Sequence, residues 1–267
     1  MLHGHWEEKV TLSTLHPQPG RQKSAASTNP WDSFPRIYCI SLAQRPDRLQ
    51  SAKTQFARIG LADKVEYIIV DKHPTDSEHG IFESHIACLR AGLAAGADKI
   101  VVFEDDVVFD RFSAHRLASA AAFMDADTDW RLFFFGCFVN SSRKTAYRSV
   151  VKIAYRCLAH GYVISRKFAQ QLVEVPYNGI SYDDHLRSLG NDGVYAIYPA
   201  FAFQSGASTD NDALKRVDRN RRLGGGLRKL QHWNEFANRR LVPLIAAHVV
   251  IAIALLLFLF RRHLPWR

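Results

Sequence analysis

Cysteine is scarce in this sequence of 267 residues: it has four, and each is isolated from the others. No two of them have the close spacing of zinc ligands, and apolar residues surround each one. We therefore exclude a disulfide framework and a structural zinc site, and we expect buried free thiols in a reducing compartment. The four are Cys39, Cys88, Cys137 and Cys157.

Acidic residues are nearly missing from the C-terminal stretch. Residues 215–267 contain 12 Lys and Arg but 2 Asp and Glu, a net charge of +10. The whole chain has 35 Lys and Arg, 26 Asp and Glu and a net charge of +9, so the other 214 residues have a net charge of −1. A nucleic-acid-binding domain carries its positive charge on its folded face, so we expect no nucleic acid partner. Anionic lipid headgroups explain a charge confined to one end better.

Charge disappears altogether from Leu241 to Phe260, where His248 is the one ionisable side chain. Twenty helical residues span the ~30 Å hydrocarbon core of a bilayer at ~1.5 Å per residue. Arginine pairs flank the run, and six Lys and Arg lie between residues 221 and 240 against three beyond the run. We therefore expect a single-pass transmembrane helix at 241–260 with the preceding domain in the cytoplasm. A buried helix of a soluble core is the alternative.

The N-terminal residues also lack an uninterrupted apolar segment, so we expect no secretory signal there. Residues 1–33 are polar and show no sustained periodicity, which indicates a flexible extension. The other expected units are a globular domain at 34–212, a basic juxtamembrane segment at 213–240 and a short basic tail at 261–267.

The central residues alternate between apolar runs and helical patterns. Pro46 begins a helix at the favoured first-turn position, and Gly60 stops it. Strands are predicted at 36–40, 65–70, 100–103, 131–139, 161–164 and 194–198, and further helices at 84–95 and 165–173. This alternation predicts an α/β domain with a mostly parallel sheet, which binds ligands at the carboxyl ends of its strands.

Three acids, Glu104, Asp105 and Asp106, directly follow the apolar run 100–103. Carboxylate oxygens suit Mn²⁺ or Mg²⁺, the cations that neutralise the diphosphate of a nucleotide sugar. Alternation along a strand would place Glu104 and Asp106 on one side and Asp105 on the other. The alternative is an acidic surface turn, although three carboxylates after a buried strand repel one another without a cation.

Several segments resemble glycosyltransferase family 25, the lipopolysaccharide and collagen galactosyltransferases. Residues 37–42 followed by 45–48 (Arg-Pro-Asp-Arg) resemble the first strand and its Arg-containing loop. Gly80 with Ser84-His85 is similar to the element that opens a helix, and residues 102–107 (Val-Phe-Glu-Asp-Asp-Val) resemble the Glu-Asp-Asp hallmark. Residues 160–165 and 182–186 resemble two later segments, and the matches occur in family order over about 36–210.

The sequence departs from the family pattern at two places. Ile81-Phe82-Glu83 separate Gly80 from Ser84, where the family usually has a small residue and Cys, and Ser41 stands where Asn is common. These departures concern the choice of donor or acceptor more than the class of reaction.

The resemblance implies a GT-A-like fold, a donor such as UDP-galactose and inversion at the anomeric carbon. Direct displacement needs a general base, for which Asp183 is the first choice and Asp184 the second. The alternative for either aspartate is to cap the helix that includes Leu186. The divalent cation would bind Glu104 and Asp106.

Six further residues are expected to bind substrate. Arg45 and Arg48 suit the diphosphate through charge-assisted hydrogen bonds. The alternative for Arg48 is a solvated helix residue. His85 would orient the donor, unless it is a structural histidine at a helix start. The full set is Ser41, Arg45, Arg48, Ser84, His85 and Asp105.

The expected function is therefore transfer of a sugar to a saccharide or lipid-linked glycan in lipopolysaccharide or surface-glycan biosynthesis, at the inner membrane. A metal-dependent phosphohydrolase and a catalytically inactive, membrane-anchored nucleotide-sugar-binding protein are the alternatives.

Overall fold

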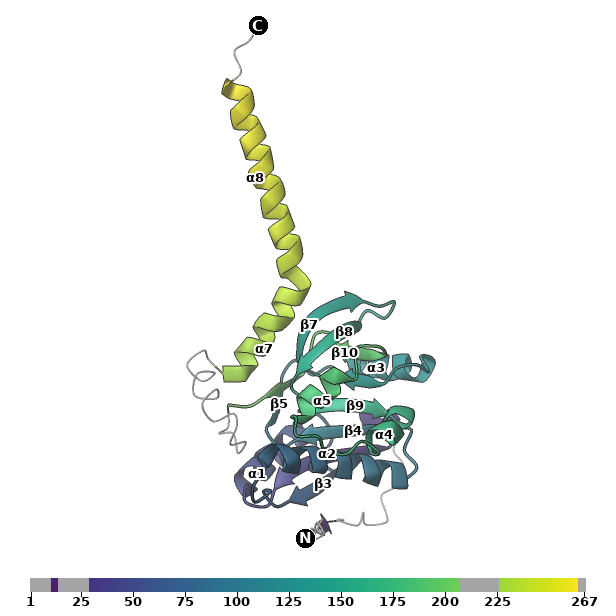
Figure 1. Ribbon diagram of the computed structural model, residues 1–267. Helices are drawn as coiled ribbons and strands as arrows, with labels where there is room; N and C mark the ends of the chain where they lie inside the picture. Colours follow the sequence, from purple (N-terminus) through teal and green to yellow (C-terminus); the bar gives the residue numbers. More distant parts are fainter. Residues whose placement is uncertain (1–10, 14–28, 207–225, 264–267) are drawn as a thin grey trace.

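The computed structural model describes residues 11–13, 29–206 and 226–263 (Figure 1). The remaining parts of the expected N-terminal extension (1–10 and 14–28), of the basic segment (213–225) and of the tail (264–267) lie outside the described residues.

A nine-stranded sheet forms the centre of the described domain, in the order β1-β3-β2-β4-β9-β6-β10-β8-β7. Its apolar strands are buried on both faces, as in sheets covered by helices. Their bounds are β1 Thr11–Ser13, β2 Arg36–Leu42, β3 Val65–Val70, β4 Lys99–Glu104, β6 Leu132–Phe134, β7 Phe138–Lys144, β8 Val150–Cys157, β9 Gly161–Ser165 and β10 Val194–Ile197.

Six of these nine strands run in one direction. β2 pairs in parallel with β3 and β4, and β6 with β10, whereas β1, β8 and β9 run the opposite way. Because β9 is inserted antiparallel between β4 and β6, its amino end lies at the same edge of the sheet as the carboxyl end of β4. The expected α/β class and the prevailing strand direction are confirmed. The antiparallel strand β9 between β4 and β6 was not predicted.

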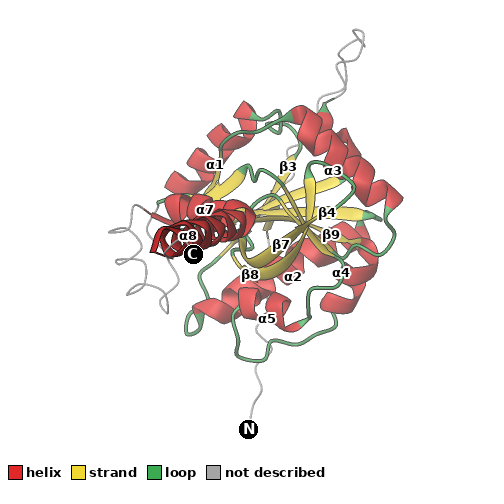
Figure 2. Ribbon diagram, turned by 90° about the horizontal axis from the view of Figure 1, so that it is seen from above, coloured by secondary structure: helices red, strands yellow, loops and turns green. Residues whose placement is uncertain are grey.

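Helices cover both faces of the sheet (Figure 2). On one face, α2 (Ser77–Ala94), α4 (Arg166–Leu172) and α5 (Tyr182–Ser188) bury residues such as Leu89, Phe168 and Leu186. On the other, α1 (Pro46–Arg58) and α3 (Ala114–Ala126) bury Phe56 and Leu117. The sheet thus separates two hydrophobic cores.

The short helix η1 (Pro30–Ser33) corrects the expected boundary of the domain. Trp31 is fully buried among Phe34, Phe103, Phe135 and Phe201, and its indole N–H donates to the carbonyl of Ile59 at 2.9 Å. The domain therefore begins several residues before the predicted start at 34. Composition did not reveal this, because one buried tryptophan in a polar stretch has no periodicity.

Two predicted elements have other bounds in the structure. The apolar run 131–139 is interrupted after Phe134 and continues as β7, which forms a hairpin with β8. Helix α2 begins at Ser77, seven residues earlier than predicted, because the Asp76 carboxylate accepts hydrogen bonds from two backbone N–H groups of the first turn.

A second, two-stranded sheet joins β5 (Val107–Phe109) to β11 (Ala202–Gln204). Helix α7 (Gly226–Phe236) packs on β11 and β7. The Gln231 side chain donates to the Ala202 carbonyl at 2.9 Å, and Asn234 bonds both the N–H and the carbonyl of Val139. The expected juxtamembrane segment therefore includes a helix that belongs to the folded domain.

Gly136 marks the point where β11 and α7 meet the main sheet. A Cβ at this position would lie 1.9 Å from the Ala202 carbonyl oxygen and 2.6 Å from Gln231 Nε2. Only glycine allows so close an approach.

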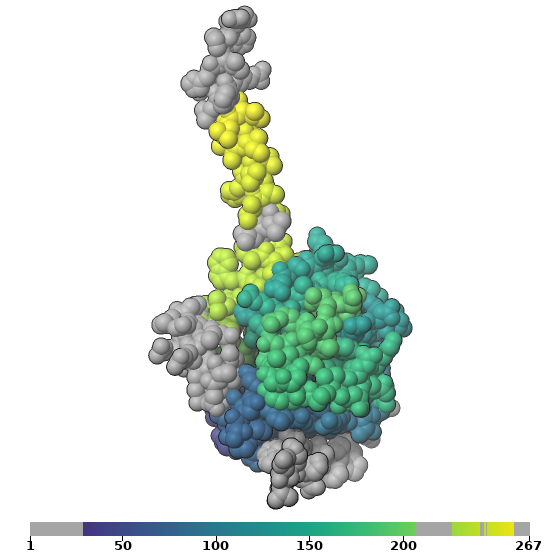
Figure 3. Space-filling view, in the orientation of Figure 1, coloured from purple at the N-terminus to yellow at the C-terminus, as the bar shows by residue number. Residues whose placement is uncertain are grey.

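After α7 the chain continues through the π-helical segment η3 (Ala237–Leu241) into α8 (Val242–His263). The side chains from Ile245 to Phe258 are exposed, and Figure 3 shows α8 standing clear of the body of the protein. Within the described residues no single helix meets the length and hydropathy needed to cross a bilayer. The pair Gly226–Arg240 and Ile245–Phe258, bent by 53°, meets both together.

Candidate active site

A cavity of about 440 Å³ opens at the edge of the sheet where β2, β3 and β4 end. The amino-terminal turns of α2 and α5 and the loop before β9 complete its walls. This is the edge at which the sequence predicted a ligand, since carboxyl ends of neighbouring parallel strands converge there.

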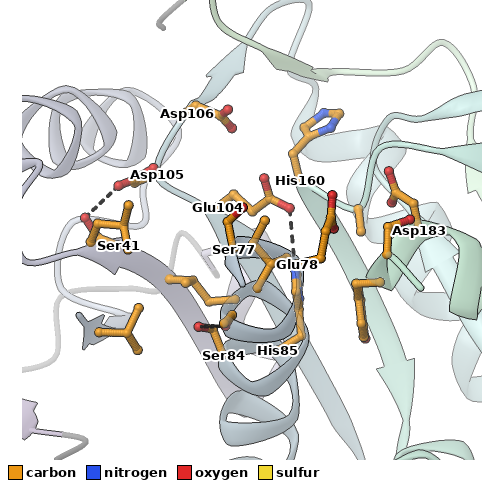
Figure 4. A pocket seen from close by; sticks show the side chains of 18 of the residues that line it. Ser41, Ser77, Glu78, Ser84, His85, Glu104, Asp105, Asp106, His160 and Asp183 are labelled. Carbon is orange, nitrogen blue, oxygen red and sulfur yellow. Dashed lines mark hydrogen bonds and ion pairs between the residues drawn. The ribbon is translucent and has the colours of Figure 1, made fainter. Parts of the chain in front are cut away.

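The acid triplet lies in the cavity wall, but its three carboxylates have different partners (Figure 4). Asp105 accepts a hydrogen bond from Ser41 Oγ at 2.7 Å and forms an ion pair with Arg48. Asp106 accepts from Gln204 Nε2 at 2.8 Å and lies 3.3 Å from Arg48 Nη2. β4 ends at Glu104, so the two aspartates lie in a turn and strand alternation does not set their directions. The pairing of Glu104 with Asp106 on a cation stays a prediction, and Glu104 is close enough to raise the pKa of Asp106.

Glu104 faces a histidine instead. Its Oε1 lies 3.5 Å from His85 Nε2, and His85 Nδ1 lies 3.1 Å from the Tyr162 hydroxyl. Complete burial, partly opposed by the charge of Asp183, lowers the pKa of His85 to about 3, so this imidazole is uncharged at neutral pH. His85 lines the cavity and stacks on Tyr182 with 4.0 Å between ring centroids, so its ring is held in place, and its expected role in orienting the donor stays a prediction.

The cluster carries excess negative charge. Burial, aided by the charge of Asp183, raises the pKa of Glu104 to about 7. Burial is also the main cause that raises the pKa of Asp105 and Asp106 above the ordinary value of an aspartate. Arg48 supplies one positive charge against these three carboxyl groups.

This charge imbalance fits a bound cation. Asp106 Oδ1 is buried and has no hydrogen-bond partner in the described ranges 11–13, 29–206 and 226–263, a costly state unless something else binds it. Among the described residues, however, no three His, Cys, Asp or Glu side chains are close enough to hold a metal ion together. The residues thus fit a cation whose remaining ligands come from a bound molecule, such as diphosphate oxygens.

Asp183 lies across the cavity from the acid triplet, in the first turn of α5. The Tyr155 hydroxyl donates to its Oδ1 at 2.5 Å, and the backbone N–H of Leu158 donates to Oδ2 at 2.9 Å. Leu158 has φ +78°, a conformation that is strained for leucine and brings its N–H to the carboxylate. Asp183 is therefore held in a fixed position.

Asp184 differs from Asp183 although both line the cavity. Its side chain is 44% exposed and pairs with Arg187 at 2.6 Å. Neither aspartate caps α5, because Ser181 Oγ accepts the N–H of Asp184 and fills that role. The capping alternative considered for the aspartates is therefore wrong.

The other predicted substrate-binding residues divide into two groups. Ser41, Arg48 and Ser84 lie in the cavity wall, although the Ser84 hydroxyl donates to the Gly80 carbonyl at 2.6 Å. Arg45 instead forms two hydrogen bonds with Asp47 at the surface and does not line the cavity.

Four residues of the site were not assigned roles from the sequence. Tyr155 and Leu158 hold Asp183, Gln204 holds Asp106, and His160 lies in the wall beside the acids. His160 is the first residue of the segment 160–165, whose resemblance to the family could have identified it as a residue of the site. The others reach the site through β8 and β11, whose pairing no local pattern encodes.

Part of the domain matches a known protein family. Residues 61–186 match the model of the family described as glycosyltransferase family 25 (LPS biosynthesis protein). This match confirms the resemblance over the second and third strands, the acid triplet and Asp183. No curated protein matches the chain by sequence.

Among solved structures, a protein from STIV is similar with a TM-score of 0.42 and 15% identity, covering 63% of this chain and 85% of that one. A glycosyltransferase involved in glycosylation of the major capsid of PBCV-1 has a TM-score of 0.36 and 12% identity, covering 56% and 73%. An active-site mutant of LgtC has a TM-score of 0.34 and 17% identity, covering 60% and 72%.

Proposed function

We propose that this protein transfers a hexose from a UDP-sugar to a saccharide or lipid-linked glycan, with galactose as the first candidate for the hexose. Residues 61–186 match glycosyltransferase family 25. The observation that carries the proposal is the acid triplet at the end of β4, in the wall of a cavity of about 440 Å³ with Asp183 opposite. A nucleotide-sugar donor requires charge neutralisation at its diphosphate, and its acceptor requires a base. The acid triplet on one side of the cavity would bind the neutralising cation, and Asp183 on the other side would be the base.

The donor occupies the side formed by the ends of β2 and β3, at the carboxyl edge where such sheets bind nucleotides. Arg48 lies on this side, bridging Asp105 and Asp106 with one guanidinium. Its side chain is 13% exposed, so a hydrogen bond from it to a diphosphate oxygen forms in a partly desolvated environment, where it is strong.

Glu104 and Asp106 would hold the divalent cation, Mn²⁺ or Mg²⁺, with Asp106 offering its unpartnered Oδ1. The bound cation would neutralise the charge that grows on the leaving diphosphate. Gln204 donates to Oδ2 of the same Asp106 carboxylate and so fixes the direction in which Oδ1 points, while Ser41 holds the adjacent Asp105.

Asp183 acts as the general base. The Tyr155 hydroxyl and the Leu158 N–H orient the carboxylate, which still has lone pairs to accept the proton of an acceptor hydroxyl. Attack from the side of Asp183, opposite the diphosphate, gives inversion at the anomeric carbon.

The C-terminal helices attach this domain to a membrane, and the acceptor is presented at that surface. Helix α8 exposes a continuous apolar surface beyond a helix that is fixed to the domain. Basic residues precede the apolar run, which favours the inner membrane with the catalytic domain in the cytoplasm. Tethering raises the local concentration of a lipid-linked acceptor.

One set of assays tests the proposal. Full-length protein is incubated with UDP-galactose and glycan acceptors, and sugar transfer, donor hydrolysis and donor binding are measured with and without Mn²⁺. Asp106→Asn should lower transfer by roughly 10²–10³ and abolish metal-dependent donor binding. The control Asp110→Asn removes a carboxylate that pairs with Arg228 outside the cavity and should remain active. Hydrolysis without transfer would indicate a phosphohydrolase, and binding without either reaction an inactive binding protein.

A further inference from the structure

His160 is a buried polar residue whose ring is unpaired within the part of the chain that the structure describes. Its side chain is 1% exposed, it lies in the cavity wall, and neither ring nitrogen has a hydrogen-bond partner among those residues. Its backbone carbonyl accepts the N–H of Glu104 at 3.2 Å, so the residue is fixed beside the acid triplet at the start of β9. Native proteins rarely leave both nitrogens of a buried imidazole unpaired, and a cavity wall is where a ligand supplies the partners.

The position of His160 indicates which part of a ligand it meets. In the view of Figure 4 its ring lies between Asp106 and Asp183, and the residue is near both Glu104 and Asp106. In the proposed function, the diphosphate lies at the acids and the acceptor at Asp183. The hexose that is transferred therefore lies between them, next to His160.

We propose that His160 hydrogen-bonds hydroxyl groups of the transferred hexose and thereby selects the donor sugar. This inference rests on the proposed function, because it takes the diphosphate and acceptor positions from it. An uncharged imidazole has one donating and one accepting nitrogen, and hydroxyl groups are the ligand atoms that meet both.

Two other partners fit His160 less well. Diphosphate oxygens only accept hydrogen bonds, so they leave the accepting nitrogen of the imidazole unpaired. A divalent cation binds one nitrogen, and His160 forms no trio of metal ligands with the carboxylates among the residues that the structure describes. A ligand with several hydroxyl groups fits best, because hydroxyl groups can accept a hydrogen bond from one ring nitrogen and donate one to the other.

The neighbouring His85 differs from His160, because the fold itself supplies contacts for its ring. It is equally buried, but it stacks on Tyr182 and bonds the Tyr162 hydroxyl. His185 provides the converse case: it is 3% exposed and both ring nitrogens lack partners, but it packs against Phe82 and does not line the cavity. It is therefore a matched control for the loss of a buried imidazole.

The test compares UDP with UDP-galactose as probes of the full-length protein in detergent micelles with Mn²⁺. His160→Leu should weaken UDP-galactose binding about tenfold, the value of two modest hydrogen bonds, and leave UDP affinity within twofold. His160→Gln, whose amide both donates and accepts, should recover part of the loss. His185→Leu should change neither affinity. Calorimetric titration measures all four proteins, and circular dichroism verifies that each is folded.

Each other outcome overturns the inference in a distinct way. An equal loss of UDP and UDP-galactose affinity would place His160 at the diphosphate or the cation. No change in either affinity would make it structural, and an equal loss in His185→Leu would trace the effect to folding. If the wild-type protein binds neither probe, the proposed function itself fails.

Discussion

Replacing Glu104 by glutamine keeps the size of the side chain but removes a carboxylate whose ionisation opposes folding. Burial, with the nearby charge of Asp183, raises the pKa of Glu104 from its ordinary 4.5 to about 7. The folded protein therefore holds a proton on this group that the unfolded chain releases between pH 4.5 and 7. The stability linked to this proton is present below pH 4.5 and is lost as the pH rises through 7.

The size of the effect follows from these two pKa values. At 1.36 kcal/mol for each pH unit, a rise from 4.5 to about 7 corresponds to about 3 kcal/mol at most. The Glu104 side chain is 26% exposed, and solvent screening reduces this figure to about 2 kcal/mol. Glu104→Gln should thus be about 2 kcal/mol more stable than the wild type at pH 8, and nearly equal to it at pH 5.

Urea unfolding of full-length protein in detergent micelles, with a metal chelator, measures this difference at several pH values. Trp31 and Trp130 are buried in the domain and supply the fluorescence signal. Glu66→Gln is the control, since Glu66 pairs with Arg36 at 2.9 Å at the surface and its loss should cost less than about 1 kcal/mol. Adding Mn²⁺ at pH 8 should stabilise the wild type more than Glu104→Gln.

The reasoning is refuted if Glu104→Gln is less stable than the wild type at pH 8 without metal. Such a result would mean that the His85 contact, 3.5 Å from Glu104, stabilises the charged carboxylate more than burial destabilises it. A difference that does not change between pH 5 and 8 would equally exclude the proposed titration.

Three further predictions concern the same domain. Arg48→Met leaves Asp105 and Asp106 buried without their guanidinium and should cost about 3 kcal/mol in urea unfolding, part of which Mn²⁺ restores; a loss below about 1 kcal/mol would contradict a buried pair. Asp183→Asn should slow sugar transfer by about 10²–10⁴ in a radiolabel assay with donor binding intact, whereas Asp184→Asn should remain close to wild type; the reverse pattern moves the base by one residue. Gly136→Ala forces a Cβ to 1.9 Å from a carbonyl oxygen, so its melting temperature should fall and transfer should weaken, and wild-type values for both would contradict the close packing.

The parts of the fold that were predictable from sequence are those with strong local signals. The apolar runs of β2, β3 and β4, the proline that begins α1 and the acids after β4 were all located correctly. Helix α2 was predicted too short because Gly80 lies in its first turns, where glycine usually indicates a helix end. In the structure Gly80 instead allows a close contact, with a Cβ placed 2.8 Å from His73 Cβ.

The parts that were missed depend on contacts far apart in the chain. The β7–β8 hairpin was located only in part. β7 presents polar residues such as Ser141 and Arg143 to solvent, and β8 alternates buried and exposed side chains instead of forming a continuous apolar run. Gln204 is one polar residue in a three-residue strand, and only the pairing of β11 with β5 brings it to Asp106. The domain start at Trp31 and the docking of α7 have the same origin, because each rests on packing between distant segments.

The seating of α7 determines how much of the C-terminal region the cavity needs. Arg111 pairs with Glu235 of this helix at 2.7 Å, and Gln231 is bonded to the strand that also carries Gln204. The helix is thus part of the folded domain, whereas α8 contacts η3. Replacing the chain beyond Arg240 should therefore leave the shape of the cavity unchanged. Ending the chain at Leu230 would remove Gln231 and Glu235, which bond Ala202 and Arg111, so a boundary that preserves the cavity lies after α7 and not within it.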